Sequence, residues 1–431
     1  MRSVAERDTD TSPASLESRE AGRGRRIASR LPEASLAAVA LYGVVTLVLL
    51  PEGSPSPLAR GVVLLAIVVV AAVAIAVARW APAWVRGLGL LLVGFAMVAV
   101  LAGVVVGRLV QNPSAGAVLG FVAGLGGVFL VIVGWQRLLH ALRRRWVRVA
   151  TAVVATVLIA QFILLPAVIA LTVTNRARPE GSDRTPADVG LAFEDVRLPA
   201  ADGSELAAWW VPGEDGAVIV LPGSGSTRDD ALDHAALLAE AGYGALVLDP
   251  RGHGESGGRL MDFGWGAELD VREAVTYVLE RPEVRGAVGV LGLSMGGEIA
   301  LTAAALDPRI GAVVAEGATA RTWEDARAEP DPHPVGIANE WVTFGLIGLL
   351  APEEPPMPLL EAVRRIDVPV LLIEGNGPKE ATLGPVYADA NPDDVMLWAL
   401  PDTPHISALR VHRAGYEERV LATFEALRPQ V

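Results

Sequence analysis

The first 174 residues contain long stretches without any charged side chain, and this feature most limits what the chain can fold into. Five apolar runs are long enough, or nearly so, to cross a bilayer core of about 30 Å. They are Ala34–Leu50, Gly61–Ala78, Gly87–Gly107, Ala115–Trp135 and Val149–Val173. We therefore expect an α-helical transmembrane bundle of five spans over residues 34–174. Residues 1–33, rich in Ser, Glu and Arg, are expected to be a disordered tail.

Arginine is distributed unevenly around these runs, and positively charged loops tend to remain in the cytoplasm. The side of the N-terminus would hold Arg19, Arg23, Arg25, Arg26, Arg30, Arg79, Arg86, Arg137, Arg143, Arg144, Arg145 and Arg148. The other side would hold Arg60, Arg108, Arg176, Arg178 and Arg184. We therefore expect a multi-pass protein of the cell membrane with its N-terminus in the cytoplasm and everything after the fifth run outside it. The runs contain no ionisable residue, which favours an anchor over a transport pathway.

The net charge changes sign along the chain. Up to residue 180, eighteen Arg stand against eight Asp and Glu, a net charge of +10, so the remainder carries −23 to give the total of −13. An acidic second half repels nucleic acid, and no nucleic-acid partner is expected. The chain has no cysteine, which excludes disulfides, thiolate metal sites and a cysteine nucleophile.

After a polar linker, 175–189, short apolar runs alternate with helical stretches. The expected strands are Leu191–Leu198, Glu205–Val211, Ala217–Leu221, Ala245–Leu248, Ala287–Leu291, Gly311–Ala315, Val368–Ile373 and Val395–Leu400. The expected helices are Arg228–Ala241, Gly264–Glu280, Met295–Leu306, Thr382–Asn391 and Ala414–Leu427. Short apolar strands joined by helices indicate an α/β domain, here 190–431, with a mostly parallel sheet covered on both faces. Ligands of such sheets bind at the carboxyl ends of the strands.

The segment Gly292-Leu293-Ser294-Met295-Gly296-Gly297 follows an expected strand and opens an Ala-rich helix. A G-x-S-x-G sequence in this position predicts a sharp strand–turn–helix elbow, in which a strained serine projects its hydroxyl from the sheet. The glycines on either side leave room for the crowded backbone. Ser294 is therefore the candidate nucleophile.

The loop Leu221-Pro222-Gly223-Ser224-Gly225-Ser226-Thr227 follows an earlier strand, and Thr227 with Asp230 predicts a capping box for the next helix. Its small residues can expose backbone N–H groups to a developing oxyanion. The best pair of donors is Ser224 N–H and Met295 N–H. The rival interpretation, a dinucleotide-binding loop, lacks the third spaced glycine and an acidic residue suitably placed for a ribose.

Two histidines compete for the role of general base. His253 lies in Asp249-Pro250-Arg251-Gly252-His253-Gly254-Glu255-Ser256-Gly257, but it precedes the serine, whereas this architecture needs the order Ser, acid, His. That segment is predicted to be a rigid loop whose shape Asp249 and Arg251 fix. His405 follows the last strand and is the candidate base, with His412 as the fallback.

The acid is expected after the strand Val368–Ile373, in the run Glu374-Gly375-Asn376-Gly377-Pro378-Lys379-Glu380. No Asp occurs a few residues past the glycine, its commonest place. Glu380 is the first candidate, because it lies in the loop and can accept a hydrogen bond from the imidazole Nδ1–H. Glu374, at the end of the strand, and Glu316, at the end of the preceding strand, remain open.

Together, the 292–297 and 249–256 motifs and His405 resemble the α/β-hydrolase superfamily, most closely its bacterial esterase, dienelactone-hydrolase-like and acyl-peptidase-like branches. The resemblance covers residues 190–430, and the membrane half lies outside it. Two positions depart from the family pattern: Pro222 stands where a histidine often precedes the oxyanion glycine, and the acid loop is atypical.

The resemblance implies a serine hydrolase that forms an acyl-enzyme on Ser294, with His405 as base, and that needs no metal or organic cofactor. Its expected partners are a small acyl substrate and the lipid bilayer. About fifty residues before Val368 have room for a helical lid, about 320–366. Its apolar residues, which serve either as core or as contacts of an acyl chain, are Trp323, Trp341, Phe344, Leu346, Ile347, Leu349 and Leu350. An acyltransferase with the same nucleophile and an inactive sensor or partner domain are the alternatives.

Overall fold

The computed structural model describes residues 82–102, 115–140, 144–174, 178–258, 263–351 and 353–429. The expected membrane runs 34–50 and 61–78, and the tail before them, lie outside the described residues. The chain divides into two compact units, residues 1–157 and 158–431. Each unit is described by itself.

In the first unit, two apolar helices, α3 (Ala83–Val100) and α5 (Ala115–Leu138), pack closely against each other. A Cβ placed on Gly94 would lie only 2.7 Å from the carbonyl oxygen of Gly127, and one on Gly124 only 2.7 Å from Leu101 Cβ. Small residues therefore let the two backbones approach, as in membrane helix pairs.

A continuous helical segment follows, built from α6 (Arg145–Ile159), the π-helical turn η2 (Ala160–Leu164) and α7 (Leu165–Thr174). Within the described residues, this thirty-residue segment is the one helix long and apolar enough to cross a membrane. Only 6% of its most apolar stretch is buried. The helices α3 and α5 also contain apolar stretches, Trp84–Val100 and Gly124–Leu138, but these are shorter. The five-span bundle therefore stays a prediction.

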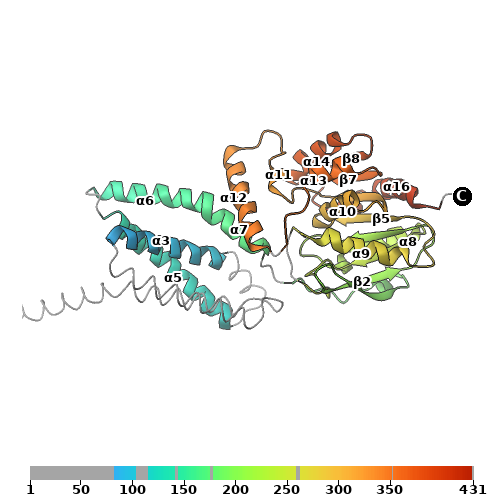
Figure 1. The fold of residues 1–431 in the computed structure, drawn as a ribbon, viewed down its shortest axis with the longest axis horizontal. Coiled ribbons are helices and arrows are strands. Elements are labelled where there is room, and N and C mark those ends of the chain that lie inside the picture. The colour runs from blue at the N-terminus through green and yellow to red at the C-terminus, as the bar shows by residue number, and fades with distance from the viewer. Residues whose placement is uncertain are drawn as a thin grey trace, which may run out of the picture. The chain divides into compact units, whose positions relative to one another are not determined.

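Within its described residues, the second unit contains one eight-stranded sheet in the order β1-β2-β4-β3-β5-β6-β7-β8. Figure 1 shows this sheet with its flanking helices. The strands are β1 (Glu194–Pro199), β2 (Glu205–Val211), β3 (Ala217–Leu221), β4 (Gly244–Leu248), β5 (Val288–Leu293), β6 (Ile310–Glu316), β7 (Val370–Glu374) and β8 (Val395–Ala399). β1 pairs with β2, and β2 with β4, in antiparallel fashion, and every other pair is parallel. The expected mostly parallel α/β sheet is confirmed, and it has the α/β-hydrolase fold.

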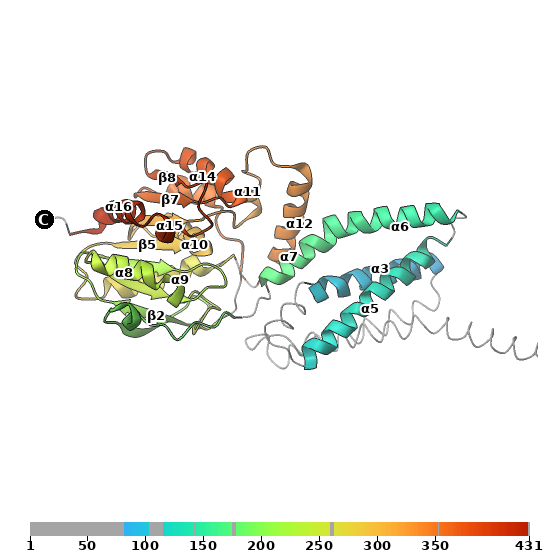
Figure 2. The same ribbon diagram turned by 180° about the vertical axis from the view of Figure 1, so that it is seen from behind.

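Helices cover both faces of this sheet, because alternate residues of each buried strand point to opposite sides. In β3, Ile219 belongs to one apolar core, and Val218 and Val220 belong to the other. The first core is closed by α9 (Ala267–Leu279), α10 (Met295–Leu306), α13 (Leu359–Arg365) and α14 (Pro378–Ala390). The second is closed by α8 (Leu232–Glu240), α15 (Ala408–Val411) and α16 (Arg413–Phe424). Figure 2 shows α8 and α16 from the side turned away in Figure 1.

In the described part of the stretch between β6 and β7, where a helical lid was expected, the chain forms three helices. They are α11 (Trp323–Ala326), α12 (Pro334–Leu350) and α13. The fully buried Arg321 precedes them and donates to the carbonyl oxygens of Phe263 (3.0 Å) and Gly264 (2.6 Å) and to Glu268 Oε2 (3.1 Å). This arginine fixes the start of the insertion to the segment before α9.

Candidate active site

Ser294 stands at the turn between β5 and α10, with φ of 53° and ψ of −119°. Such a conformation is rare for a residue with a side chain and is strained. Its neighbours must be glycine: a Cβ on Gly292 would lie 2.1 Å from the carbonyl oxygen of Gly296, and one on Gly296 would lie 2.3 Å from that of Leu221. The sharp elbow expected from the G-x-S-x-G sequence is present.

The structure brings the three first-choice residues together into one hydrogen-bonded chain. His405 Nε2 lies 2.9 Å from Ser294 Oγ, and His405 Nδ1 lies 2.6 Å from Glu380 Oε1. The three residues follow β5, β8 and β7, so all stand beyond the carboxyl ends of the strands. The arrangement can move the hydroxyl proton of Ser294 to the imidazole while Glu380 stabilises the resulting charge.

Glu380 lies in the first turn of α14, and not in a loop as the sequence suggested, because the helix begins at Pro378 instead of Thr382. A proline is favourable at the first helical position, where no N–H partner is needed. The carboxylate is 2% exposed, and its Oε2 accepts from Gly375 N–H at 2.7 Å. Burial alone would raise the pKa of Glu380, but the hydrogen bonds from His405 and Gly375 outweigh it and hold this pKa below the ordinary value. Glu380 is therefore ionised at neutral pH.

His405 is held between Glu380 and the backbone after β6. The hydrogen bond to Glu380 raises the pKa of His405 above its ordinary value, although burial opposes the rise. Gly317, at φ +75°, lies directly beside the ring: a Cβ there would come within 2.7 Å of His405 Cε1 and 2.9 Å of Nδ1. The imidazole therefore fits only because residue 317 has no side chain.

The two alternative acids take other positions. Glu316 Oε1 accepts from Ala408 N–H at 2.8 Å, and burial raises the pKa of Glu316 to about 7. Glu374 is buried at the end of β7, and burial, together with the nearby charge of Glu380, raises its pKa well above the ordinary value. At neutral pH Glu374 therefore favours its neutral form and Glu316 is only partly ionised, so both are less suited than Glu380 to stabilise an imidazolium. His412, the fallback base, has its Nε2 2.8 Å from Thr403 Oγ1.

The expected oxyanion loop lies against the nucleophile, since a Cβ on Gly223 would be 3.3 Å from Ser294 Cβ. Met295 is the first residue of α10, where backbone N–H groups have no partner within the helix. Ser224 lies in the same loop as Gly223. The predicted capping box between Thr227 and Asp230 is present at the next helical turn.

His253 has a role that sequence reasoning missed. It is buried, its Nδ1 lies 3.0 Å from the carbonyl oxygen of Arg251, and its Nε2 accepts from Gly225 N–H at 3.2 Å. These partners require a neutral ring with its proton on Nδ1. His253 thus ties the 249–257 loop to the oxyanion loop. The sequence contains no pattern from which a contact between residues 253 and 225 could be predicted.

The 249–257 segment is a loop, and Asp249 and Arg251 hold its shape through hydrogen bonds. Asp249 accepts from the N–H groups of Arg228 (2.7 Å) and Glu255 (3.0 Å). Arg251 donates to both oxygens of Asp270, at 3.0 and 2.7 Å. These bonds fix the loop on which His253 stands.

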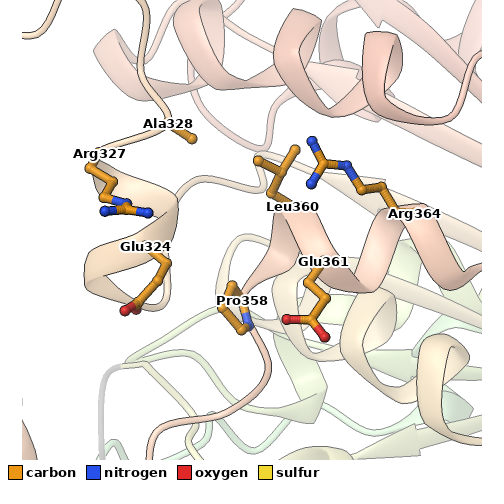
Figure 3. A pocket seen from close by; sticks show the side chains of 7 residues that line it. All are labelled: Glu324, Arg327, Ala328, Pro358, Leu360, Glu361 and Arg364. Carbon is orange, nitrogen blue, oxygen red and sulfur yellow. The ribbon is translucent and has the colours of Figure 1, made fainter.

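Two hollows lie over the insertion between β6 and β7. The first, about 610 Å³, opens between α11 and α13 and has charges of both signs, with Arg327 and Arg364 beside Glu324 and Glu361 (Figure 3). The second, about 460 Å³, is lined mainly by apolar residues of α11 and α12. Its walls include Trp265, Trp323, Trp341, Phe344, Leu346 and Leu349. The second has the apolar lining that organic ligands prefer.

Comparison with known proteins agrees with this fold. A family model described as serine aminopeptidase, S33 matches residues 212–343, a stretch that includes Ser294 but neither Glu380 nor His405. The chain is similar to a polyketide transferase, grgF, of a Penicillium species, 36% identical over 136 residues that cover 29% of this chain and 45% of that protein. It is also similar to 2,6-dihydropseudooxynicotine hydrolase of Paenarthrobacter nicotinovorans, 33% identical over 110 residues, which are 25% of this chain and 29% of that protein.

The chain thus spans less than half the length of the curated relatives it matches. Among solved structures, the esterase Pf2001 of Pyrococcus furiosus covers 58% of this chain and 98% of its own, with 23% identity and a TM-score of 0.48. The order of the strands and the serine elbow are those of the α/β-hydrolase fold. The matched relatives bear both hydrolase and transferase names.

Proposed function

We propose that this chain is a membrane-anchored serine hydrolase that cleaves carboxylic esters through an acyl-enzyme on Ser294. The observation that carries the proposal is the unbroken hydrogen-bonded chain from Ser294 Oγ through His405 to Glu380. A serine hydroxyl is a weak nucleophile unless a positioned base removes its proton. Here the base, its orienting carboxylate and the strained elbow occur at one edge of the sheet.

In the first half of the reaction, Ser294 Oγ attacks the acyl carbonyl as His405 Nε2 takes its proton. Glu380 accepts from His405 Nδ1–H and stabilises the imidazolium. The N–H groups of Met295 and Ser224 are the proposed donors to the tetrahedral oxyanion. His405 then protonates the departing alkoxide. In the second half, water attacks the acyl-enzyme by the same proton transfers, and the free acid leaves.

The proposed substrates are amphipathic or lipid acyl esters. The hollow between α11 and α12 is lined by aromatic and aliphatic side chains, and an acyl chain placed there would lose contact with water. Hydrolysis rates for a series of p-nitrophenyl esters test this point. The proposal requires kcat/KM to rise from acetate to medium-chain esters, and a preference for acetate would contradict it.

The direct test of the chemistry is the full-length chain in detergent or nanodiscs with Ser294→Ala. Ester hydrolysis and labelling by a fluorophosphonate should both disappear. His412→Ala is the matched control, because His412 bonds to Thr403 at a distance from the nucleophile chain, and it should retain activity. An active Ser294→Ala enzyme would refute the proposal, and a parent chain without any activity would leave the inactive sensor or partner domain.

The membrane part of the proposal rests on the apolar helix Arg145–Thr174 and on the arginine asymmetry around the expected spans. We propose that the hydrolase unit lies outside the cytoplasm. A charged, membrane-impermeant fluorophosphonate should label Ser294 in intact cells. Labelling that appears only after lysis would reverse the orientation while leaving the chemistry in place.

Acyl transfer is a second candidate, favoured by the similarity to a protein named as a polyketide transferase. The same acyl-enzyme would pass its acyl group to an alcohol or amine in place of water. Product analysis with and without a primary alcohol separates the two functions. Free acid as the sole product at a high alcohol concentration would exclude transfer.

A further inference from the structure

The helix α12 packs its C-terminal half against α7, the last part of the membrane-type helix. Ile347 of α12 and Ala170 of α7 are both fully buried in one apolar cluster with Trp265. Both elements belong to the same compact unit, and α12 also lies beside η2. Figures 1 and 2 both show the end of α12 on α7. An element of the hydrolase domain is therefore fixed to the apolar helix itself.

The length of that helix sets the depth of the contact. Thirty residues rise about 45 Å at 1.5 Å per residue, and a bilayer core takes about 30 Å of this length. Ala170 lies four residues before the helix end at Thr174, or about 6 Å along its axis. In a membrane-spanning helix of this length, α12 would meet it near the boundary between the hydrocarbon core and the headgroups.

Other side chains of α12 are apolar and exposed. Leu349 is 82% exposed and Trp341 is 64% exposed, and Leu350 is also exposed. On α7, Leu165 and Ile169 are exposed as well. Several bulky apolar side chains exposed on two packed helices mark a place where another apolar phase is met. Tryptophan in particular is favoured at the level of lipid headgroups.

Glu340 is the single charged residue within Pro334–Leu350, and it forms an ion pair with Lys379 at the start of α14. The charge of α12 is thus paired with the first turn of α14. At 17 residues, α12 rises about 25 Å, too short to cross the core. Because its one charged residue is paired with Lys379, α12 carries no unpaired charge that would oppose contact with lipid.

We propose that α12 lies in the interface of the bilayer that α7 enters, with Trp341, Leu349 and Leu350 in contact with lipid. The inference rests on the proposed membrane anchoring. Its consequence concerns the substrate: Trp341 and Leu349 also line the apolar hollow between α11 and α12. A lipid ester would reach the active site from the bilayer and not from bulk water.

The absence of cysteine allows a direct test with single-cysteine variants of the full-length chain. Leu349→Cys carries an environment-sensitive fluorophore, and the protein is reconstituted into phosphatidylcholine nanodiscs with or without lipids that bear a nitroxide on the acyl chain. We expect blue-shifted emission and loss of most of the fluorescence with the nitroxide lipid. Met396→Cys, on β8 and 63% exposed, is the matched control that should show neither effect.

Val154→Cys, on the exposed apolar surface of α6, reports the anchor itself. Quenching at 154 without quenching at 349 overturns the inference and leaves the anchoring intact. No quenching at either position overturns the anchoring as well. A blue shift at 349 that disappears at one chain per nanodisc would show that a second copy covers α12, and would also overturn the inference.

Discussion

Gly317→Ala tests whether the position of His405 controls the rate. A Cβ at residue 317 would come within 2.7 Å of His405 Cε1 and 3.1 Å of Ile406 Cγ2. The first distance is shorter than Cβ atoms show in proteins, and the second requires Ile406 to move by a few tenths of an ångström. The ring must therefore move away from residue 317, and its hydrogen bonds to Ser294 and Glu380, at 2.9 and 2.6 Å, cannot both keep their lengths.

Two separate effects are expected from this substitution. The backbone of residue 317 has φ of +75°, and an alanine in the left-handed region costs about 1–2 kcal/mol. In a domain of this size, that loss lowers the Tm by a few degrees. The displacement of the imidazole acts on the rate instead. A misplacement of about 1 Å in a catalytic group lowers kcat by about 10²-fold.

A matched control separates the two effects. Gly203, in the turn between β1 and β2, has φ of +82°, and a Cβ there meets nothing within 4 Å. Gly203→Ala therefore carries the backbone strain without the collision. The assay is ester hydrolysis at saturating substrate, together with thermal unfolding of both variants. We expect similar losses of Tm and a large loss of kcat in Gly317→Ala alone. A kcat within threefold of the parent in Gly317→Ala would refute the reasoning.

Four further outcomes follow from the site. Glu380→Gln should lower kcat by about 10³–10⁴-fold, the size of the tautomer effect in Ser-His-Asp enzymes. Glu374→Gln should change kcat little, because burial already favours the neutral form of that carboxyl group. If the two variants lost kcat equally, Glu380 would not be the acid of the triad. His405 can act as a base only in its neutral form, and its pKa is raised above 6.5. On acidification, kcat/KM of the parent should therefore fall to half its maximum at a pH above 6.5. An inflection below pH 6.5 in the rate profile would contradict the ion pair with Glu380. His253→Leu should lower kcat about tenfold with little change in KM, because a donor loop acts on the transition state. A change confined to KM would instead show that His253 contributes to ground-state binding.

The nucleophile was predictable because its signal is local. The strand before Ser294, the helix after it and the glycines around it all lie within a dozen residues of Ser294 on either side. Each of them is required by the geometry of a single turn, since the glycines leave room for the backbone. His405 could be predicted from chain order, because the histidine of this architecture follows its last strand.

The acid was harder to choose because three glutamates fall near the ends of adjacent strands. What separates them is their environment. Gly375 N–H and His405 stabilise the charge of Glu380, whereas Glu316 and Glu374 are buried with fewer compensating donors. Burial and hydrogen bonds to a group come from residues distant in the sequence. Glu380 lies on a helix because α14 begins at Pro378. The sequence had predicted the start of this helix four residues later, and so had placed Glu380 in a loop.

Contacts between distant segments carry no pattern of their own. The bond from Gly225 to His253 joins two loops that belong to separate strands. The packing of Ile347 on Ala170 joins the lid region to a helix before the hydrolase domain. Apolar periodicity predicts that each of these helices buries a face, but it does not identify the partner.

The geometry of the sheet explains why residue 317 has to be glycine. β8 lies three strands from β5, about 14 Å away at the usual strand spacing, yet His405 must reach Ser294. The loop after β8 crosses in steps. Thr403 accepts from Asn376 N–H after β7 at 2.9 Å, and Ala408 N–H bonds to Glu316 at the end of β6. Between these two fixed points the imidazole passes over Gly317 to the serine. A side chain on residue 317, the first after β6, would block that path. His405 can therefore cross from β8 to Ser294 only if residue 317 is glycine.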